Sequence, residues 1–150
     1  MGTIRRLMDP NLWLTAVSTP PQLIRCEICN GWRVCIQTTS FPLGTRCLRC
    51  RGTGIHRGIF SVLQQLYGPR LEQLAGKHAY ELSAHGTIFN VLKRRAAELQ
   101  FTLTCSEYVD GVASGTIPNG VRCENVESLS FADDTFDLIT STDVFEHVEN

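Results

Sequence analysis

Residues 79–108 read AYELSAHGTIFNVLKRRAAELQFTLTCSEY, and their pattern of apolar residues predicts the fold class. Residues 79–83 are mostly apolar with a polar end, as expected of a short buried strand. Residues 87–99 predict an amphipathic helix, and residues 101–105 predict a second strand. The apolar stripe of the helix consists of Ile88, Val91, Leu92, Ala96 and Leu99. Strand, helix and strand at this spacing predict an α/β fold with a parallel sheet.

Two further short strands are predicted downstream, at residues 121–123 and 136–140. Ligands of open parallel sheets bind beyond the carboxyl ends of the strands, where the strand order reverses. Polar side chains follow each predicted strand, namely Glu81, Ser83, Glu107, Tyr108, Asn125 and Asp143. We therefore expect a ligand pocket at this edge. The alternative for the two glutamates is that they are solvated loop carboxylates.

Four cysteines precede this segment, as Cys26-x2-Cys29, seventeen further residues, and Cys47-x2-Cys50. This spacing is typical of a structural zinc site, in which four thiolates form a closed tetrahedron. A glycine stands two positions after the second cysteine of each pair, and there we expect a left-handed backbone. Apolar and polar residues alternate over residues 32–37, as in a strand with one covered face. The pattern predicts a zinc ribbon; the alternative is a set of buried or redox-active thiols.

Composition and charge divide the chain into two parts. The chain has 150 residues, of which 43% are hydrophobic and 19% charged, which excludes collagen-like, disordered and coiled-coil proteins. Residues 25–57 hold six arginines against one glutamate, whereas residues 58–150 hold six basic and thirteen acidic residues. The arginines either contact nucleic acid phosphates or offset the charge of a zinc–thiolate centre. A short basic module therefore precedes a longer acidic one.

The remaining segments define the expected domain boundaries. Residues 1–23 have no predicted role, and residues 24–57 form the cysteine module. Residues 58–76 predict linking helices: an apolar stripe ends at Gly68-Pro69, and a second helix restarts over residues 70–75. The stripe is Ile59, Val62, Leu63, Leu66 and Tyr67. No apolar stretch of about 18 residues is present, so we expect no membrane span, and with no secretion signal we expect a cytoplasmic protein.

The loop after the first predicted strand restricts the class of ligand. A dinucleotide fold needs a G-x-G-x-x-G motif there, so that a diphosphate can approach bare backbone. Only Gly86 stands in this loop, which argues against a nicotinamide oxidoreductase. An adenosyl ligand without phosphates needs an acid for its ribose and a flat surface for its adenine. Glu107, which follows Glu81 by 26 residues, and the adjacent Tyr108 suit these two roles.

Four motifs together resemble a known family. They are Tyr80–Gly86, Cys105–Tyr108, Val121–Phe131 and Phe136–Val148. Residues 77–150 resemble the N-terminal half of a class I S-adenosylmethionine-dependent methyltransferase of the type 11 group, and members with an N-terminal cysteine ribbon also occur. The resemblance implies a Rossmann-like sheet of which the first four of seven strands are present, and methyl transfer to an unidentified acceptor by a fragment of a longer enzyme. The alternative is a non-catalytic zinc-binding interaction module with an inert, truncated sheet.

The resemblance also implies a role for each polar strand-end residue. Glu81, Ser83 and Gly86 match the loop that wraps the methionine part of S-adenosylmethionine. Glu107 matches the acid that binds the ribose, and Tyr108 matches the neighbour that covers adenine. Asn125 stands where the family usually has an aspartate near the adenine amine, and its side-chain oxygen can still accept a hydrogen bond. Asp143 lies where the family lines the mouth of the cofactor and substrate site.

Overall fold

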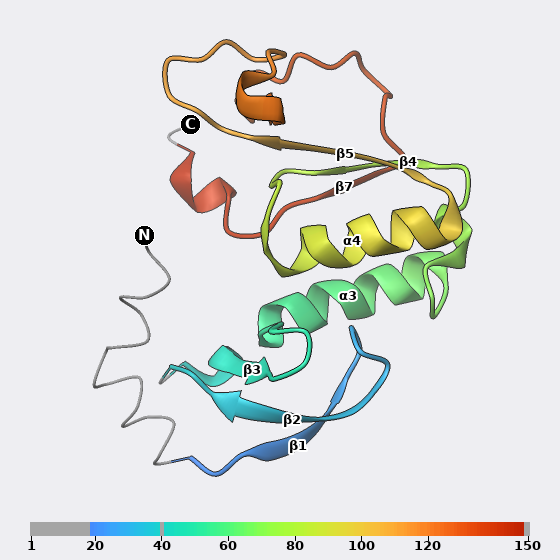
Figure 1. Ribbon diagram of the computed structural model, residues 1–150, viewed down its shortest axis with the longest axis vertical. Helices are drawn as coiled ribbons and strands as arrows, with labels where there is room; N and C mark the ends of the chain where they lie inside the picture. Colours follow the sequence, from blue (N-terminus) through green and yellow to red (C-terminus); the bar gives the residue numbers. More distant parts are fainter. Residues whose placement is uncertain (1–18, 40, 149–150) are drawn as a thin grey trace. The chain divides into compact units, whose positions relative to one another are not determined.

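The computed structural model describes residues 19–39 and 41–148 (Figure 1). The chain divides between Gln65 and Leu66 into two compact units, each with its own sheet. Within the described residues, neither helix has the length and apolar character needed to cross a membrane. The two units are described separately.

The first unit is built on a three-stranded antiparallel sheet with the order β1-β2-β3. The strands are β1 (Gln22–Cys26), β2 (Gly31–Gln37) and β3 (Thr45–Cys47), and a 3-10 turn, Pro42–Gly44, precedes β3. The alternation predicted over residues 32–37 is present. The covered face carries Cys35, which pairs with Cys47, whereas Trp32 on the opposite face is 63% exposed. The sheet therefore buries cysteines rather than its large apolar side chains.

A helix, α3 (Gly54–Tyr67), begins in the first unit and ends in the second. The helix starts four residues before the predicted linking segment, residues 58–76, and the hydroxyl of Thr53, which precedes it, contacts the His56 ring. Phe60 and Leu63 are buried, but Val62 and Leu66 of the predicted stripe are exposed. The stripe was therefore only partly correct.

The helix predicted over residues 70–75 is wrong, because only a 3-10 turn, Glu72–Leu74, forms there. Gly68 and Leu71 both adopt positive φ angles, which an α-helix cannot contain. The Glu72 carboxylate accepts a hydrogen bond from the backbone N–H of Arg70 at 2.8 Å and closes the turn. Leu71 and Leu74 are nevertheless fully buried, so this segment contributes to the core without forming an α-helix.

The second unit contains the predicted parallel sheet, with the order β6-β5-β4-β7. Its strands are β4 (His78–Glu81), β5 (Thr102–Glu107), β6 (Arg122–Cys123) and β7 (Leu138–Thr140). Successive strands extend the sheet outward from β4 to β6, and then β7 returns to the free edge of β4. The strand order therefore reverses beside β4, which places the expected ligand edge at the residues that follow β4 and its neighbours.

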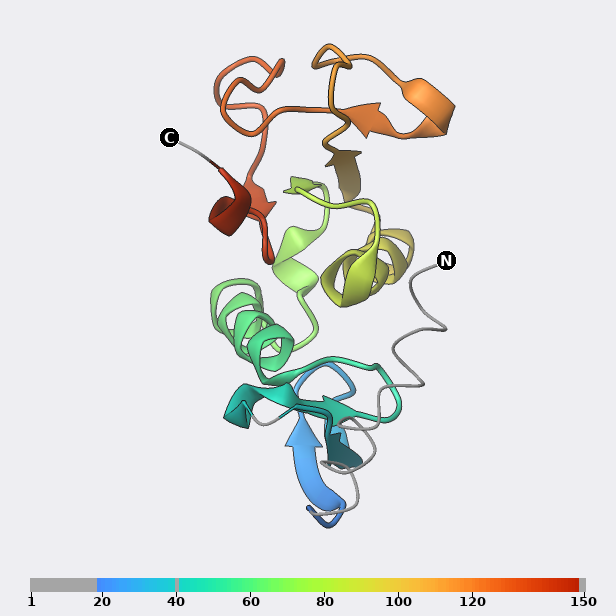
Figure 2. The ribbon, with the colours of Figure 1, turned by 90° about the vertical axis from the view of Figure 1, so that its left-hand side faces the viewer.

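The helix α4 (Gly86–Leu99) follows β4 directly and runs along the sheet beside β5 (Figures 1 and 2). The predicted stripe is confirmed at its centre, where Ile88, Val91 and Leu92 are buried. The connection from β5 to β6 contains only a 3-10 turn, Pro118–Gly120, and a last turn, Phe145–His147, follows β7. Three aromatic rings cluster beside β4. The Phe136 ring stacks on the Tyr80 ring with 4.9 Å between centroids, and the Phe131 ring contacts both of them edge-on.

Candidate functional site

The four cysteines of the two Cys-x2-Cys pairs converge at one end of the antiparallel sheet. Their sulfur atoms all lie within 4.8 Å of one another. The Sγ atoms of Cys26 and Cys50 are 3.6 Å apart, and those of Cys29 and Cys47 are 3.9 Å apart. A zinc ion bound tetrahedrally to sulfur at about 2.3 Å requires sulfur–sulfur separations of about 3.8 Å. The cluster therefore has the dimensions of a four-thiolate zinc site.

The turns that carry these cysteines have a left-handed residue, but it is not the expected glycine. Asn30 and Arg51, which directly follow the second cysteine of each pair, have φ angles of 49° and 61°. Gly31 and Gly52 have no positive φ, so the expected role of these glycines is wrong. Gly52 instead donates its backbone N–H to the Cys50 sulfur at 3.4 Å. The turns thus direct backbone N–H groups at the sulfur atoms, which favours thiolates.

The electrostatics of the cluster favour a bound cation. Burial raises the pKa of Cys26 well above the usual range of a thiol and raises the pKa of Cys50 to about 11. Burial acts in the same direction on Cys47, but backbone N–H groups of Cys50 and Arg49 outweigh it and bring the pKa of Cys47 to about 7. Four adjacent thiols do not all ionise without a compensating charge. A divalent metal supplies that charge, so the residues present fit zinc.

In the second unit, the loop between β4 and α4 contacts the Glu107 carboxylate at the end of β5. Three hydrogen bonds reach one oxygen, Oε1: from the Ala84 backbone N–H at 2.6 Å, from His85 Nδ1 at 2.6 Å and from the Ser83 hydroxyl at 3.2 Å. Gly86 ends the loop with a φ of 91°, and the space where a Cβ would stand is open. The structure thus brings three predicted site residues together: Ser83, Gly86 and Glu107.

Glu81, the last residue of β4, is buried beside this loop. Its carboxylate is 1% exposed and accepts a hydrogen bond from the Thr140 hydroxyl of β7. Burial raises the pKa of Glu81 to about 7, and the nearby Glu107 charge acts in the same direction. Glu81 is therefore a carboxyl group poised between its neutral and ionised forms near neutral pH, and a cation placed beside it would favour the ionised form.

Tyr108 and Asn125 line one pocket of about 430 Å³ at the carboxyl ends of β4, β5 and β6. Tyr108 is 63% exposed, and among the residues that the structure describes its hydroxyl donates a hydrogen bond to Asp110 alone, at 3.4 Å. The Asn125 side-chain oxygen accepts the Glu127 backbone N–H at 3.0 Å, and the Asn125 backbone N–H donates to the Ser114 hydroxyl. The Asn125 amide is thus held in place, and its oxygen keeps a second lone pair for a ligand.

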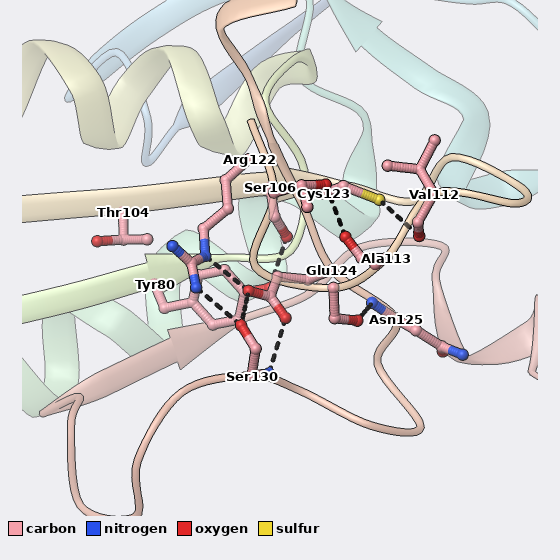
Figure 3. Close-up of polar contacts among 12 residues, drawn as sticks. Tyr80, Thr104, Ser106, Val112, Ala113, Arg122, Cys123, Glu124, Asn125 and Ser130 are labelled. Atoms are coloured by element: carbon pink, nitrogen blue, oxygen red, sulfur yellow. Dashed lines mark hydrogen bonds and ion pairs between the residues drawn. The ribbon is translucent and has the colours of Figure 1, made fainter. Parts of the chain in front are cut away.

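Glu124, which lines this pocket, belongs to a network of polar contacts with Arg122 and Ser130 (Figure 3). Glu124 accepts hydrogen bonds from Arg122 Nε at 2.6 Å and from the Ser130 hydroxyl and backbone N–H at 2.6 and 2.8 Å. The Glu124 side chain is 1% exposed; burial raises its pKa, but Ser130 and Arg122 outweigh burial and hold the pKa below its usual range. The Arg122 guanidinium also lies over the Phe131 ring. The network fixes the segment after β6, and therefore Asn125.

Sequence analysis singled out neither Arg122 and Glu124 nor His85 as site residues. Arg122 and Glu124 are two positions apart, so a strand places both side chains on one face of the sheet. This spacing could have predicted that the two charges pair. His85 had no comparable signal. Asp143 is exposed, with a φ of 56°, and within the described residues no hydrogen bond or ion pair joins it to the other strand-end residues. Of the seven residues expected at the edge, Ser83 and Glu107 are joined by a hydrogen bond, and Tyr108 and Asn125 line one pocket. Asp143 belongs to neither group.

A parallel sheet with this strand order and an acid-lined carboxyl edge is the architecture of a Rossmann-like nucleoside-binding domain. Residues 75–150 match the family model described as "Methyltransferase domain", which is half of the chain. The chain therefore belongs to the methyltransferase domain family, whose cofactor is S-adenosylmethionine. The comparisons with curated proteins and with solved structures found no match.

Proposed function

We propose that the second unit binds S-adenosylmethionine at the carboxyl edge of its sheet and positions the methyl group for transfer to an unidentified acceptor. The observation that carries this proposal is the Glu107 carboxylate, which the loop after β4 holds at the end of β5. Its two neighbours in the chain, Ser106 and Tyr108, line the pocket. Within the described residues, every hydrogen bond to the Glu107 carboxylate reaches Oε1. The second oxygen is therefore available to the hydroxyl groups of a ribose.

The other strand-end residues have complementary roles in this proposal. Ser83 and Gly86 form the loop for the methionine part of the ligand, where the open space at Gly86 allows close approach. Glu81 provides a negative charge for the cationic end of the ligand. Tyr108 provides a ring face for adenine, and the Asn125 amide binds the edge of that ring. Asp143 lies at the mouth of the site.

When bound, S-adenosylmethionine would supply a methyl group on a positively charged sulfur: a nucleophile of the acceptor would bond to the methyl carbon as the carbon–sulfur bond breaks, and S-adenosylhomocysteine would leave. The chain contributes position and orientation, which account for most of the rate enhancement in a displacement of this kind. No general base is needed unless the nucleophile carries a proton that it must lose.

We further propose that Cys26, Cys29, Cys47 and Cys50 bind a structural zinc ion. A closed four-thiolate site has no open position for water, so its contribution is stability rather than catalysis. In this proposal residues 24–57 are the zinc module, residues 58–76 are the link, and residues 77–150 belong to the methyltransferase part. The seven free cysteines suit the reducing conditions of the cytoplasm, our proposed location.

Isothermal titration with S-adenosylhomocysteine tests the proposed cofactor site. We expect binding by the unaltered chain and a loss of roughly 10- to 100-fold in affinity for Glu107→Ala, since a hydrogen bond to a charged group contributes about 1.5–3 kcal/mol. Asp133→Ala, an exposed carboxylate in a turn before β7, is the matched control and should bind normally. Absence of binding at millimolar ligand in a folded, zinc-loaded protein contradicts the proposal.

One observation favours a second candidate function, an interaction module built on the zinc unit. Leu23, Trp32 and Val34 lie on the exposed face of the antiparallel sheet, and the surrounding segment is strongly basic. Arginines beside an exposed aromatic ring suit a single-stranded nucleic acid. Binding of a labelled oligonucleotide by a protein that does not bind S-adenosylhomocysteine would favour this alternative.

A further inference from the structure

The loop between β4 and α4 differs from a phosphate- or nucleoside-binding loop made of bare backbone. Such loops use successive glycines so that the ligand approaches the main chain. Here Gly86 is the single glycine of the loop. Ser83 and His85, which come three positions and one position before it, both carry polar side chains. These side chains point to Glu107 rather than away from the site, because both contact its Oε1 atom. The loop therefore acts on the ligand edge through Glu107.

His85 makes the shortest side-chain contact with this carboxylate. Its Nδ1 atom lies 2.6 Å from Glu107 Oε1, and since a carboxylate only accepts, Nδ1 carries the proton. The Ser83 hydroxyl also lies 3.1 Å from Nδ1 and accepts the His85 backbone N–H. Ser83 and His85 thus hold each other as well as Glu107.

Exposure explains why such a contact matters. The Glu107 side chain is 34% exposed and the His85 side chain is 78% exposed, so both belong to the surface that a ligand meets. A glutamate in this position has three rotatable bonds, and fixing them before the ligand arrives removes an entropic cost of binding. Ala84 and His85 fix Oε1 in the loop, so that Oε2 is directed elsewhere.

We propose that His85 is a positioning residue for the nucleoside: it clamps Oε1 of Glu107 so that Oε2 is presented to the ribose hydroxyls. This inference rests on the proposed cofactor site. It assigns His85 no contact with the methyl group and no part in proton transfer. It predicts that the histidine contributes to affinity only for ligands that carry the ribose hydroxyls.

Two nucleosides and two variants test the clamp. Affinities for adenosine and for 2′,3′-dideoxyadenosine are measured by NMR titration on the zinc-loaded chain. His85→Ala should weaken adenosine binding about tenfold, as expected for one lost hydrogen bond to a charged group, and should change dideoxyadenosine binding by less than about twofold. His85→Asn keeps an N–H donor at the place of Nδ1 and should recover most of the affinity for adenosine. Glu107→Ala combined with His85→Ala should bind no more weakly than Glu107→Ala alone.

The contrary outcomes are distinct. Equal loss for both nucleosides means that His85 orders the loop in general, and tighter binding by His85→Ala means that the histidine blocks the site; either result overturns the clamp. A spectroscopic measurement needs no ligand: the imidazole ¹⁵N signals of His85 should show a protonated Nδ1 that changes in Glu107→Ala. Unchanged signals overturn the clamp while leaving the proposed cofactor site intact. Failure of the unaltered chain to bind any adenosine ligand overturns the cofactor site and the clamp together.

Discussion

The two candidate sites are assembled in opposite ways. In the first unit all four ligands come from two short turns, and each turn supplies a pair of sulfur atoms at fixed spacing. In the second unit each strand end supplies one or two side chains, and the partners of the Glu81 and Glu107 side chains are 20 or more residues away along the chain. In our proposal the first site depends on a bound metal for order, whereas the second depends on sheet register and buried charge. This difference predicts which perturbations each unit tolerates.

Removal of metal should have the largest effect and should be confined to the first unit. Structural zinc contributes on the order of 10 kcal/mol in small cysteine modules, which exceeds the stability of a sheet of three short strands. Chelation, or Cys47→Ser, should therefore abolish hydrogen-exchange protection in β1, β2 and β3 while β4 and β5 stay protected. Cys105→Ser, outside the cluster, is the control and should retain zinc by elemental analysis. A mildly purified protein without zinc would contradict the four-thiolate site.

The second unit should instead be most sensitive to the charge pair of Arg122 and the buried Glu124. Arg122→Ala leaves the Glu124 carboxylate without its cation, and because Arg122 is 28% exposed the cost should fall below the value of about 3–5 kcal/mol for a fully buried pair. Urea unfolding followed in the second unit measures this loss. Arg94→Ala removes an exposed arginine that pairs with Glu98 on α4, and should cost less than about 0.5 kcal/mol. Equal effects of the two substitutions would mean that the network does not support the sheet edge.

The same contrast explains what the sequence predicted and what it missed. The cysteine spacing contains the whole site, so the cluster followed from Cys26, Cys29, Cys47 and Cys50 alone. The strands and α4 followed from apolar periodicity, since burial of one face fixes the pattern. The partners of Glu81 and Glu107 could not be predicted from periodicity, because these contacts depend on how strands distant in sequence align. Residues 70–75 were wrong for a local reason: the left-handed Leu71 interrupts a pattern that periodicity alone reads as helix.

Glu81 contrasts with Glu124, because within the described residues no cation pairs with its buried carboxyl group. In the unfolded chain the Glu81 carboxyl ionises near its ordinary pKa of 4.5, whereas in the folded chain burial raises its pKa to about 7. The folded state therefore binds an extra proton between these values, and this residue lowers stability as pH rises through that window, by up to about 3 kcal/mol. Glu124, with its pKa lowered, acts in the opposite direction and loses stability as pH falls.

Glu81→Gln should accordingly stabilise the second unit at pH 8 and have little effect at pH 4.5. The amide keeps an oxygen for the Thr140 hydroxyl, so the substitution removes the charge and not the contact. Urea midpoints at the two pH values measure the difference, with Glu98→Gln on the exposed face of α4 as the control. The same variant should bind S-adenosylhomocysteine more weakly, which separates a site residue from a core residue. A midpoint shift that is equal at both pH values would rule out ionisation as its cause.

Tyr108 should show the smallest effect, and one confined to the ligand. The side chain is exposed, so Tyr108→Ala should leave the urea midpoint unchanged. Loss of a ring face for adenine costs about 0.5–1.5 kcal/mol, which corresponds to a three- to tenfold weaker affinity for S-adenosylhomocysteine. Tyr108→Phe should bind within about twofold of the unaltered chain. The hydroxyl that this variant lacks donates a hydrogen bond to Asp110 at 3.4 Å and lies outside the stacking surface of the ring. If Tyr108→Phe is as weak as Tyr108→Ala, the hydroxyl rather than the ring contacts the ligand, and adenine does not lie on this side of the pocket.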